Sequence, residues 1–244
     1  MLDFLVIGAQ KASTSWLFQV LSMHPRTYFP LGKEVNFWCD DNKDESFFTY
    51  YRERFSDGYL ISKNKYICGD MSPSYAPMSR HKIARIYKWY PNVKVVYILR
   101  EPLARSWSAL QMSLDARKES APSAEKASAI MTSNGVISHS NYAANLDRWR
   151  NVIDESESKT YPLTIIQERI EQDPLEALGK ICEFLGLDSQ FYHDLPRQHL
   201  EERVLQGSRE PLLKQYSEEC TQVYSKLRSL TRQSIADDIP EWPL

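Results

Sequence analysis

The sequence predicts a three-layer α/β fold, with helices on both faces of a central parallel sheet. Continuous apolar runs at residues 4–7 (FLVI) and 93–99 (VKVVYIL) suit strands that are buried on both faces. Residues with helical periodicity follow each run, and strand and helix alternate along the chain. The 244 residues can build one substantial core. We see no repeat and no linker, so we expect a single domain over residues 1–244.

The other elements follow in chain order. We expect a helix over residues 13–23, capped by Ser13 or Thr14, and then a loop or short extended segment over 28–38. Further helices are predicted over 44–55, 79–90, 103–115, 137–153, 174–185 and 211–230, and further strands over 66–68 and 163–166. Pro174 and Gly186 mark the two ends of one of these helices. Residues 116–133 have little apolar periodicity, and we expect them to be mobile.

The composition argues against several classes of partner and cofactor. The formal net charge is −2, so no global basic field indicates nucleic acid, and an anion site would be local. The four cysteines form no CxxC pair, which argues against a zinc or redox motif; reduced thiols are expected, with disulfides as the alternative. No apolar run approaches the ~20 residues of a membrane span. Nor is there a signal peptide, so we expect a cytoplasmic chain with no membrane partner.

A loop suited to an anion follows the first predicted strand. The segment GAQKASTS begins at Gly8 and offers small residues, the charge of Lys11 and three hydroxyl groups. The start of the next helix adds unpaired N–H groups and the positive end of its dipole. A plain strand–helix turn is the alternative. The nucleoside-triphosphate loop has a second glycine and a lysine at the helix start, and this segment has neither, which disfavours a kinase or an ATPase.

A second stretch, VVYILREPLARSWSAL, places Arg100 directly at the end of a buried strand, with Arg105 and Ser108 on the helix that follows. Ligands of open parallel sheets bind at the carboxyl ends of strands. Guanidinium groups pair with oxyanions in bidentate fashion, so an arginine and a serine here would form a phosphate clamp. The alternative is a structural ion pair of either arginine with Glu101 or another acid.

These motifs, in this order, resemble the sulfotransferases that use 3′-phosphoadenosine 5′-phosphosulfate (PAPS). The pattern is closest to the heparan-sulfate-type enzymes and their small bacterial relatives. GAQKASTSWL resembles the family's 5′-phosphosulfate loop, REPLARSWS its 3′-phosphate motif, and KEVNFW the segment with the catalytic glutamate. GDMSPSY, NYAANLDRW and ERIEQDPLEALGKICEFLGL resemble later segments, so the likeness covers most of the chain.

The resemblance implies roles for particular residues. Glu34 would be the general base that takes a proton from a hydroxyl or amine of a saccharide or small-molecule acceptor, and Lys11 would stabilise charge on the leaving oxygen. Arg100 and Ser108 would grip the 3′-phosphate, and no metal would be needed. The 5′-phosphosulfate would bind at the loop residues Lys11, Ala12, Ser13, Thr14, Ser15 and Trp16. Glu34 could instead be a surface acid, and Lys33 could tune it, contact the sulfonate or lie on the surface.

The sequence also departs from the family pattern. Asp70 and Met71 stand where the family has glutamate and lysine, and the missing lysine argues against a glycan acceptor. Asp70 is then either a second proton carrier or a structural residue of the turn. Residues 207–209 could replace a family clamp on the 3′-phosphate. We expect acceptor-binding loops over 40–65 and 116–138. We expect core packing for Tyr142 and Trp149 and local hydrogen bonding for His24 and His139.

Two other functions stay open at this point. An ATP-dependent phosphotransferase would need Mg²⁺ and residues to hold it, and the sequence shows no suitable carboxylate cluster. A non-catalytic nucleotide-binding module would bind the donor without turnover. The near-neutral net charge disfavours a highly anionic polymer as acceptor.

Overall fold

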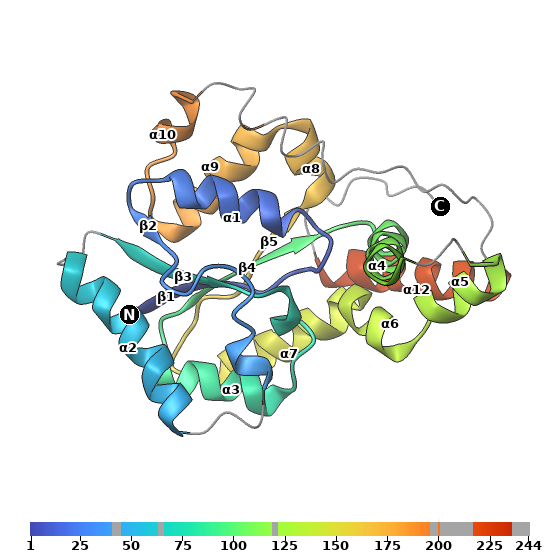
Figure 1. Cartoon of the computed structure of the whole chain (residues 1–244), viewed down its shortest axis with the longest axis horizontal. Coiled ribbons are helices and arrows are strands. Elements are labelled where there is room, and N and C mark those ends of the chain that lie inside the picture. Colours follow the sequence, from blue (N-terminus) through green and yellow to red (C-terminus); the bar gives the residue numbers. More distant parts are fainter. Residues whose placement is uncertain (41–44, 63–65, 119–121, 196–199, 201–216, 236–244) are drawn as a thin grey trace.

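A five-stranded parallel sheet forms the centre of the protein (Figure 1). The computed structural model describes residues 1–40, 45–62, 66–118, 122–195, 200 and 217–235. The strands are β1 (Leu2–Val6), β2 (Thr27–Tyr28), β3 (Ile67–Met71), β4 (Lys94–Leu99) and β5 (Leu163–Ile166), in the order β2-β3-β1-β4-β5. β1 lies at the centre, with Val6 opposite Met71 on one side and Val96 on the other. The predicted α/β fold with a parallel sheet is confirmed.

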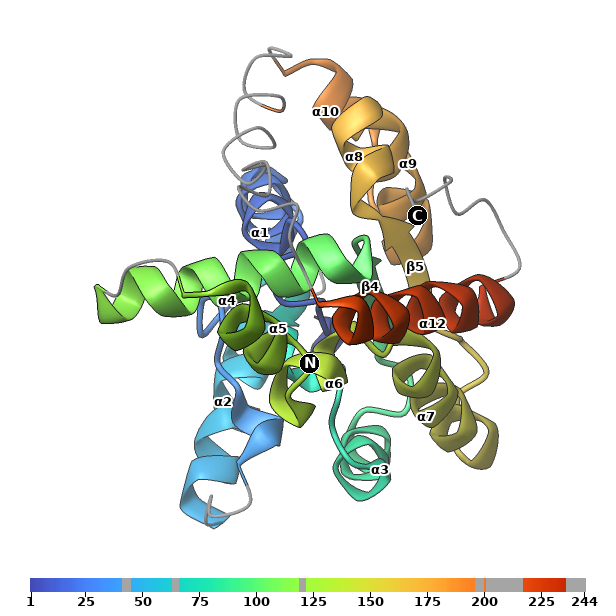
Figure 2. The same ribbon diagram turned by 90° about the vertical axis from the view of Figure 1, so that its right-hand side faces the viewer.

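Helices cover both faces of the sheet, as Figures 1 and 2 show from two directions. One face carries α1 (Thr14–Met23), α8 (Gln167–Gln172), α9 (Pro174–Leu185) and α10 (Gln190–His193), and the other carries α2 (Glu45–Ser62), α3 (Arg80–Trp89) and α7 (Tyr142–Glu155). One hydrophobic cluster runs through all three layers. The strand side chains Leu5, Val6 and Val96 are fully buried in it, and each such side chain stabilises the fold by about 1.5–3 kcal/mol.

A second group of helices lies beyond the carboxyl ends of the strands (Figure 1). It consists of α4 (Pro102–Arg117), α5 (Ala124–Met131), α6 (Asn134–Ser140) and α12 (Glu218–Ser234). These helices pack around a smaller apolar cluster that includes Trp107, Met131 and Tyr224. The short 3₁₀ helices η1 (Phe37–Cys39) and η2 (Pro73–Tyr75) complete the described elements. No helix among the described residues is long and apolar enough to cross a membrane.

The expectation that residues 116–133 are mobile was wrong for most of this segment. α4 continues to Arg117, and α5 occupies Ala124–Met131 with the Ser123 hydroxyl at its N-terminus. Met131 is fully buried, and its carbonyl accepts a hydrogen bond of 2.6 Å from Tyr224 Oη of α12. The apolar partners of α5 come from α4 and from α12, which lies far along the chain, so local periodicity could not reveal them. Residues 119–121 lie outside the described part.

Other boundaries also differ from the prediction. The helix expected over 137–153 is two helices, α6 and α7, which meet at Asn141, and the Asn141 side chain accepts from Ala144 N to cap α7. α12 begins at Glu218 and ends at Ser234, and residues 211–216 lie outside the described part. α2 reaches Ser62 and β3 reaches Met71, each longer than expected.

Candidate active site

The loop after β1 starts beside the end of β4. Ala9 N donates to Ile98 O at 2.6 Å, and Ile98 N donates to Gly8 O at 2.8 Å. Gly8 has φ of +143°, and a Cβ at this position would lie 3.0 Å from the carbonyl oxygen of Pro73. Both the backbone angle and the close approach require glycine. Gly8 therefore lets the loop pack against η2.

The loop leaves the start of α1 without a side-chain cap. Lys11 and Ser13 both have left-handed backbone angles, with φ of 68° and 54°. Ser13 occupies the N-cap position, but its side chain makes no capping hydrogen bond, so the predicted serine cap is not formed. The first turn of α1 also contains no acidic residue. Its N–H groups and the positive end of the helix dipole thus suit an anion.

A cavity of about 380 Å³ lies over this helix start, within the size range of small-molecule sites. It gathers residues from five separate stretches of sequence. The lining residues are Gln10, Lys11, Ser13, Thr14, Ser15, Trp16, Gln19, Lys33, Glu34, Pro73, Arg100, Ser108, Met112 and Gln167. The structure thus brings together every predicted site residue except Ala12. Ala12 is fully buried, and its N–H donates to Ala9 O at 3.1 Å.

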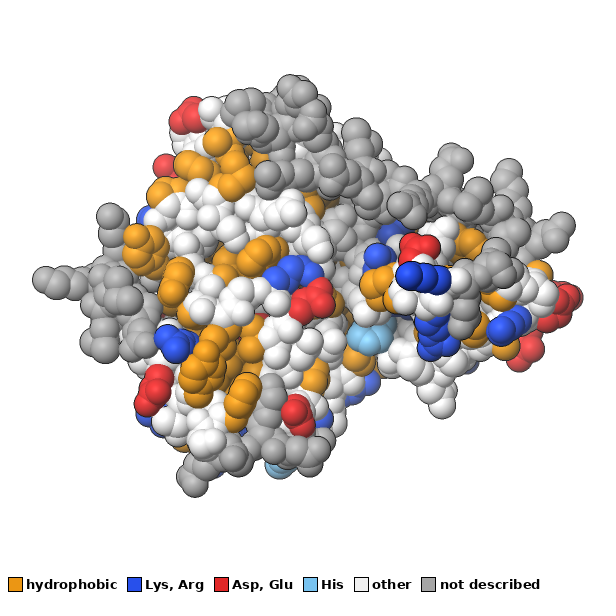
Figure 3. All heavy atoms as spheres, viewed as in Figure 1, with side chains coloured by type: hydrophobic (Ala, Val, Ile, Leu, Met, Phe, Trp, Pro, Cys, Tyr) orange, Lys and Arg blue, Asp and Glu red, His pale blue; other side chains and the backbone are white. Residues whose placement is uncertain are grey.

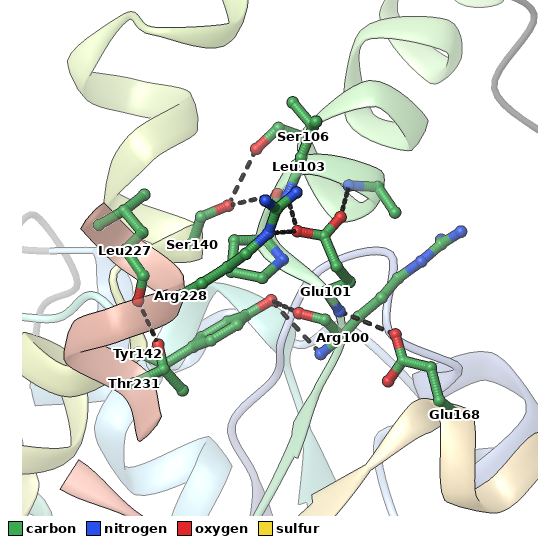
Figure 4. A network of polar contacts seen from close by, with 12 residues as sticks. Arg100, Glu101, Leu103, Ser106, Ser140, Tyr142, Glu168, Leu227, Arg228 and Thr231 are labelled. Atoms are coloured by element: carbon green, nitrogen blue, oxygen red, sulfur yellow. Dashed lines mark hydrogen bonds and ion pairs between the residues drawn. The ribbon is translucent and has the colours of Figure 1, made fainter. Parts of the chain in front are cut away.

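Arg100 extends from the carboxyl end of β4 and is 9% exposed. Its Nη1 donates to the backbone oxygen of Lys11 at 3.0 Å, which joins the two anion-binding stretches. Tyr142 Oη donates to Arg100 O at 2.8 Å, and Figure 4 shows the Arg100 side chain pointing away from this tyrosine. A guanidinium carries five N–H donors, so several can serve a bound anion.

Arg105 and Glu101, two other charged residues of the motif, make structural contacts instead, and Figure 4 shows those of Glu101. Arg105 is fully buried and donates to Ser140 Oγ at 2.6 Å, Ser106 Oγ at 2.7 Å and Val136 O at 2.9 Å. Glu101 accepts from the backbone of the first turn of α4 and forms an ion pair of 2.6 Å with Arg228 of α12. The partner of Glu101 is thus neither Arg100 nor Arg105.

Glu34 and Lys33 lie at the cavity in a segment that β3 holds. The two side chains form an ion pair, in which the glutamate is 55% exposed and the lysine 18%. Glu34 has a left-handed backbone angle, φ 63°, and its N–H donates to Met71 O at 2.8 Å. An exposed carboxylate next to a cationic cavity is open to an acceptor from solvent.

Asp70 does not line the cavity. It is fully buried, and its carboxylate accepts hydrogen bonds from the hydroxyls of Tyr51, Ser72 and Tyr75. Met71, at the position of the family lysine, is also fully buried. The burial of Asp70 therefore fits a structural role better than a role in direct proton transfer. Residues 207–209 lie outside the described part, so the second predicted clamp has no structural account.

The expected packing of the aromatic residues is confirmed, since Tyr142 and Trp149 are both fully buried. His24 makes the expected local hydrogen bond, because its Nδ1 accepts from Arg26 N at 3.1 Å. His139 does not: its buried Nδ1 has no hydrogen-bond partner among the described residues. Burial, together with the nearby Arg105 charge, lowers the pKa of His139 to about 4.

Sequence reasoning missed several lining residues, and for one of them a signal was present. Gln167 directly follows β5, so it lies at the carboxyl edge of the sheet, just as Arg100 does. Its Oε1 is buried with no hydrogen-bond partner in the described part of the chain. Gln10, Gln19, Pro73 and Met112 carried no comparable signal. No group of three metal-ligating side chains occurs among the described residues.

Comparison with known proteins places the chain in a family. A family profile for the sulfotransferase domain matches residues 2–238. The chain belongs to the sulfotransferase domain family. The human heparan sulfate glucosamine 3-O-sulfotransferase 3B1 is 28% identical over 203 residues, which cover 77% of this chain and 48% of the relative. The human enzyme 3A1 is similar to the same extent, with 28% identity and 46% of its length covered. This sulfotransferase-domain chain thus spans about half the length of the curated relatives it matches.

Solved structures share the fold of this sulfotransferase-domain chain. A sulfotransferase from Alicyclobacillus acidocaldarius superposes with a TM-score of 0.69 at 21% identity, covering 98% of this chain and 97% of the other. The mouse sulfotransferase SULT7A1, solved in complex with PAP, superposes with a TM-score of 0.54 at 15% identity, covering 97% and 85%. At these identities the likeness concerns the fold alone.

Proposed function

We propose that this chain is a PAPS-dependent sulfotransferase that moves a sulfuryl group to a hydroxyl or amine of a carbohydrate or small-molecule acceptor. One observation carries the proposal. A single cavity gathers the uncapped start of α1 with Lys11, the Arg100–Ser108 pair and the carboxylate of Glu34. PAPS has anionic groups at both its 5′ and 3′ positions, so it calls for two anion-binding elements and a nearby base.

The loop and α1 would hold the 5′-phosphosulfate end of the donor. The unpaired N–H groups of the first turn and the hydroxyls of Ser13, Thr14 and Ser15 supply hydrogen bonds there. Lys11 would stabilise the negative charge that builds on the oxygen left behind when the sulfuryl group departs. Arg100 and Ser108 would bind the 3′-phosphate, since guanidinium and hydroxyl groups both donate to phosphate oxygens.

Glu34 would act on the acceptor. Its exposed carboxylate would take the proton from the attacking hydroxyl or amine, while the cavity walls hold the two reactants in line. Lys33, paired with Glu34, would hold this carboxylate in position. The relatives that are named for heparan sulfate glucosamine make a saccharide one candidate acceptor. The net charge of −2 argues against a highly anionic polymer, and on the face shown in Figure 3 the Lys and Arg side chains are interspersed with Asp and Glu.

Thermal unfolding with nucleotides, in the absence of magnesium, tests the donor site. We expect 3′-phosphoadenosine 5′-phosphate (PAP) to raise the melting temperature, because a ligand at 100 times its dissociation constant stabilises by about 2.7 kcal/mol. AMP, which lacks the 3′-phosphate, should give a much smaller shift. Arg100→Ala should abolish the response to PAP. Arg117→Ala removes an exposed arginine at the end of α4, the helix that follows Arg100, outside the cavity lining, and should keep the response.

Two outcomes would contradict the proposal. A shift with ATP and Mg²⁺ but none with PAP would favour the phosphotransferase. A shift with PAP but no transfer from radiolabelled PAPS to a glucosamine oligosaccharide, a phenol or a long-chain alcohol would favour a non-catalytic binding module.

A further inference from the structure

The buried carboxylate of Asp70 is held by three hydroxyl groups from different parts of the chain. Tyr51 Oη of α2 donates to Oδ2 at 2.9 Å, Tyr75 Oη of η2 donates to Oδ2 at 2.7 Å, and Ser72 Oγ donates to Oδ1 at 2.9 Å. Burial, and then the charge of Asp70, raises the pKa of both tyrosines well above its ordinary value. Both phenols therefore keep the proton that they donate.

A chain of hydrogen bonds leads from this carboxylate to Glu34. Ser72 Oγ, which donates to Asp70, accepts from the backbone N–H of Asn36 at 3.0 Å. Asn36 Nδ2 in turn donates to the carbonyl oxygen of Glu34 at 3.0 Å. The N–H of Glu34 donates to Met71 O at 2.8 Å, next to Asp70 in β3. The N–H of Glu34 is thus bound to the residue next to Asp70, and its carbonyl is bound to Asn36, which Ser72 holds.

The backbone of this segment needs such support. Glu34 and Asn36 both have left-handed angles, φ 63° and 52°, which are unfavourable for residues other than glycine. They persist only where surrounding contacts determine the conformation. The ring of Tyr51, whose hydroxyl binds Asp70, also stacks on Phe37 with 4.1 Å between ring centroids. Phe37, which follows Asn36, is therefore held by the same tyrosine that binds Asp70.

We propose that Asp70 is a positioning residue for the general base, acting through Ser72 and Asn36 to hold Glu34 in its reactive place. This inference rests on the proposed function, since it takes Glu34 as the base. Asp70 does not line the cavity. It acts on the orientation of Glu34 and leaves donor binding to Lys11 and Arg100.

Amide exchange in Asp70→Asn tests the network without any acceptor. An asparagine at this position has an NH₂ group that cannot accept from a hydroxyl, so one of the three hydrogen bonds is lost. We expect the amides of Glu34 and Asn36 to exchange with solvent at least tenfold faster. Asp3→Asn is the matched control, because Asp3 also accepts a hydrogen bond on β3, from Cys68 N, at the other end of the strand. It should leave both amides at the wild-type rate.

Turnover then separates positioning from mere stability. With PAPS and whichever acceptor of the panel reacts, Asp70→Asn should lower kcat by about 10- to 100-fold, the effect of a displacement near 1 Å. PAP affinity should stay within about twofold of wild type. In a Glu34→Gln background the effect of Asp70→Asn should largely vanish, because the two residues act as one unit. Ser72→Ala, which cuts the link to Asn36, should behave in the same way and serves if Asp70→Asn does not fold.

Unchanged exchange of both amides in Asp70→Asn would overturn the proposal. So would an equal loss of kcat in the presence and absence of the Glu34 carboxylate. Failure of the proposed function gives a different result: wild type would not bind PAP or would transfer to no acceptor, while the exchange measurement would still report on the network.

Discussion

Among single residues, Glu34 is the one whose chemistry the proposed reaction tests most directly. It is exposed at the cavity, and it is paired with Lys33. Glu34→Gln keeps the shape of the side chain and removes the basic oxygen, so we expect kcat to fall by about 10²–10⁴-fold, the usual contribution of a general base. PAP affinity should stay near the wild-type value, because the proposed donor contacts involve Lys11, Arg100 and Ser108 rather than Glu34. Steady-state kinetics and thermal shifts measure the two effects.

The control for Glu34→Gln is Glu53→Gln, which changes an exposed glutamate of α2 outside the cavity lining. It should leave kcat unchanged. A normal kcat in Glu34→Gln would show that another group takes the proton.

At the scale of elements, the ion pair of Glu101 and Arg228 joins the start of α4 to α12. Both side chains are 9% exposed, with Arg228 Nε 2.6 Å from Glu101 Oε1. Arg228→Met leaves the Glu101 carboxylate buried without its partner, and breaking such a pair costs about 3–5 kcal/mol. We expect the free energy of unfolding in urea to fall by that amount. Arg232→Met, which alters an exposed residue one turn later, should change it by less than about 0.5 kcal/mol. Equal losses in the two variants would argue against the ion pair.

For the whole molecule, the partly buried His139 predicts how stability depends on pH. Its pKa is about 4 in the folded protein, against about 6.5 in the unfolded chain. Between these values the unfolded chain binds a proton that the folded protein does not, so stability is lost as the pH falls from 6.5 to 4. The loss is of order 3 kcal/mol in the free energy of unfolding.

Replacement of this histidine should flatten the pH dependence. The free energy of unfolding of His139→Gln should fall less between pH 7 and pH 4 than that of wild type. His81→Gln changes an exposed histidine of α3 and should keep the wild-type slope. An unchanged slope in His139→Gln would place the acid sensitivity in other groups.

Local sequence signals predicted a good part of both the fold and the candidate site. The apolar runs predicted β1, β4 and β5, and Arg100 at the end of a strand was enough to point to the cavity. The segments at Lys11, Glu34 and Arg100 each had a recognisable spacing, and the structure brings them to one cavity. Signals of this kind are readable because they depend on residues that are neighbours in sequence.

Contacts between distant residues limited the prediction. The apolar partners of α5 belong to α4 and α12, so its own short sequence showed little apolar periodicity. Arg105 looked like an anion ligand because its hydrogen-bond partners, Ser140 and Val136, lie on another helix. The pattern of Asp70 fitted a proton carrier and a turn residue equally well. Only its burial beneath Tyr51 and Tyr75 distinguished the two.

By itself, the sequence determined the fold class, the strand–loop–helix at Lys11 and the family resemblance, because periodicity and motif spacing are local properties of the chain. The tertiary structure decided which charged side chains reach the cavity and which are buried. Arg100 and Glu34 line it, whereas Arg105 and Asp70 are fully buried away from its lining. The physical reason is that burial and hydrogen bonding depend on elements brought together only when the sheet and its helices pack.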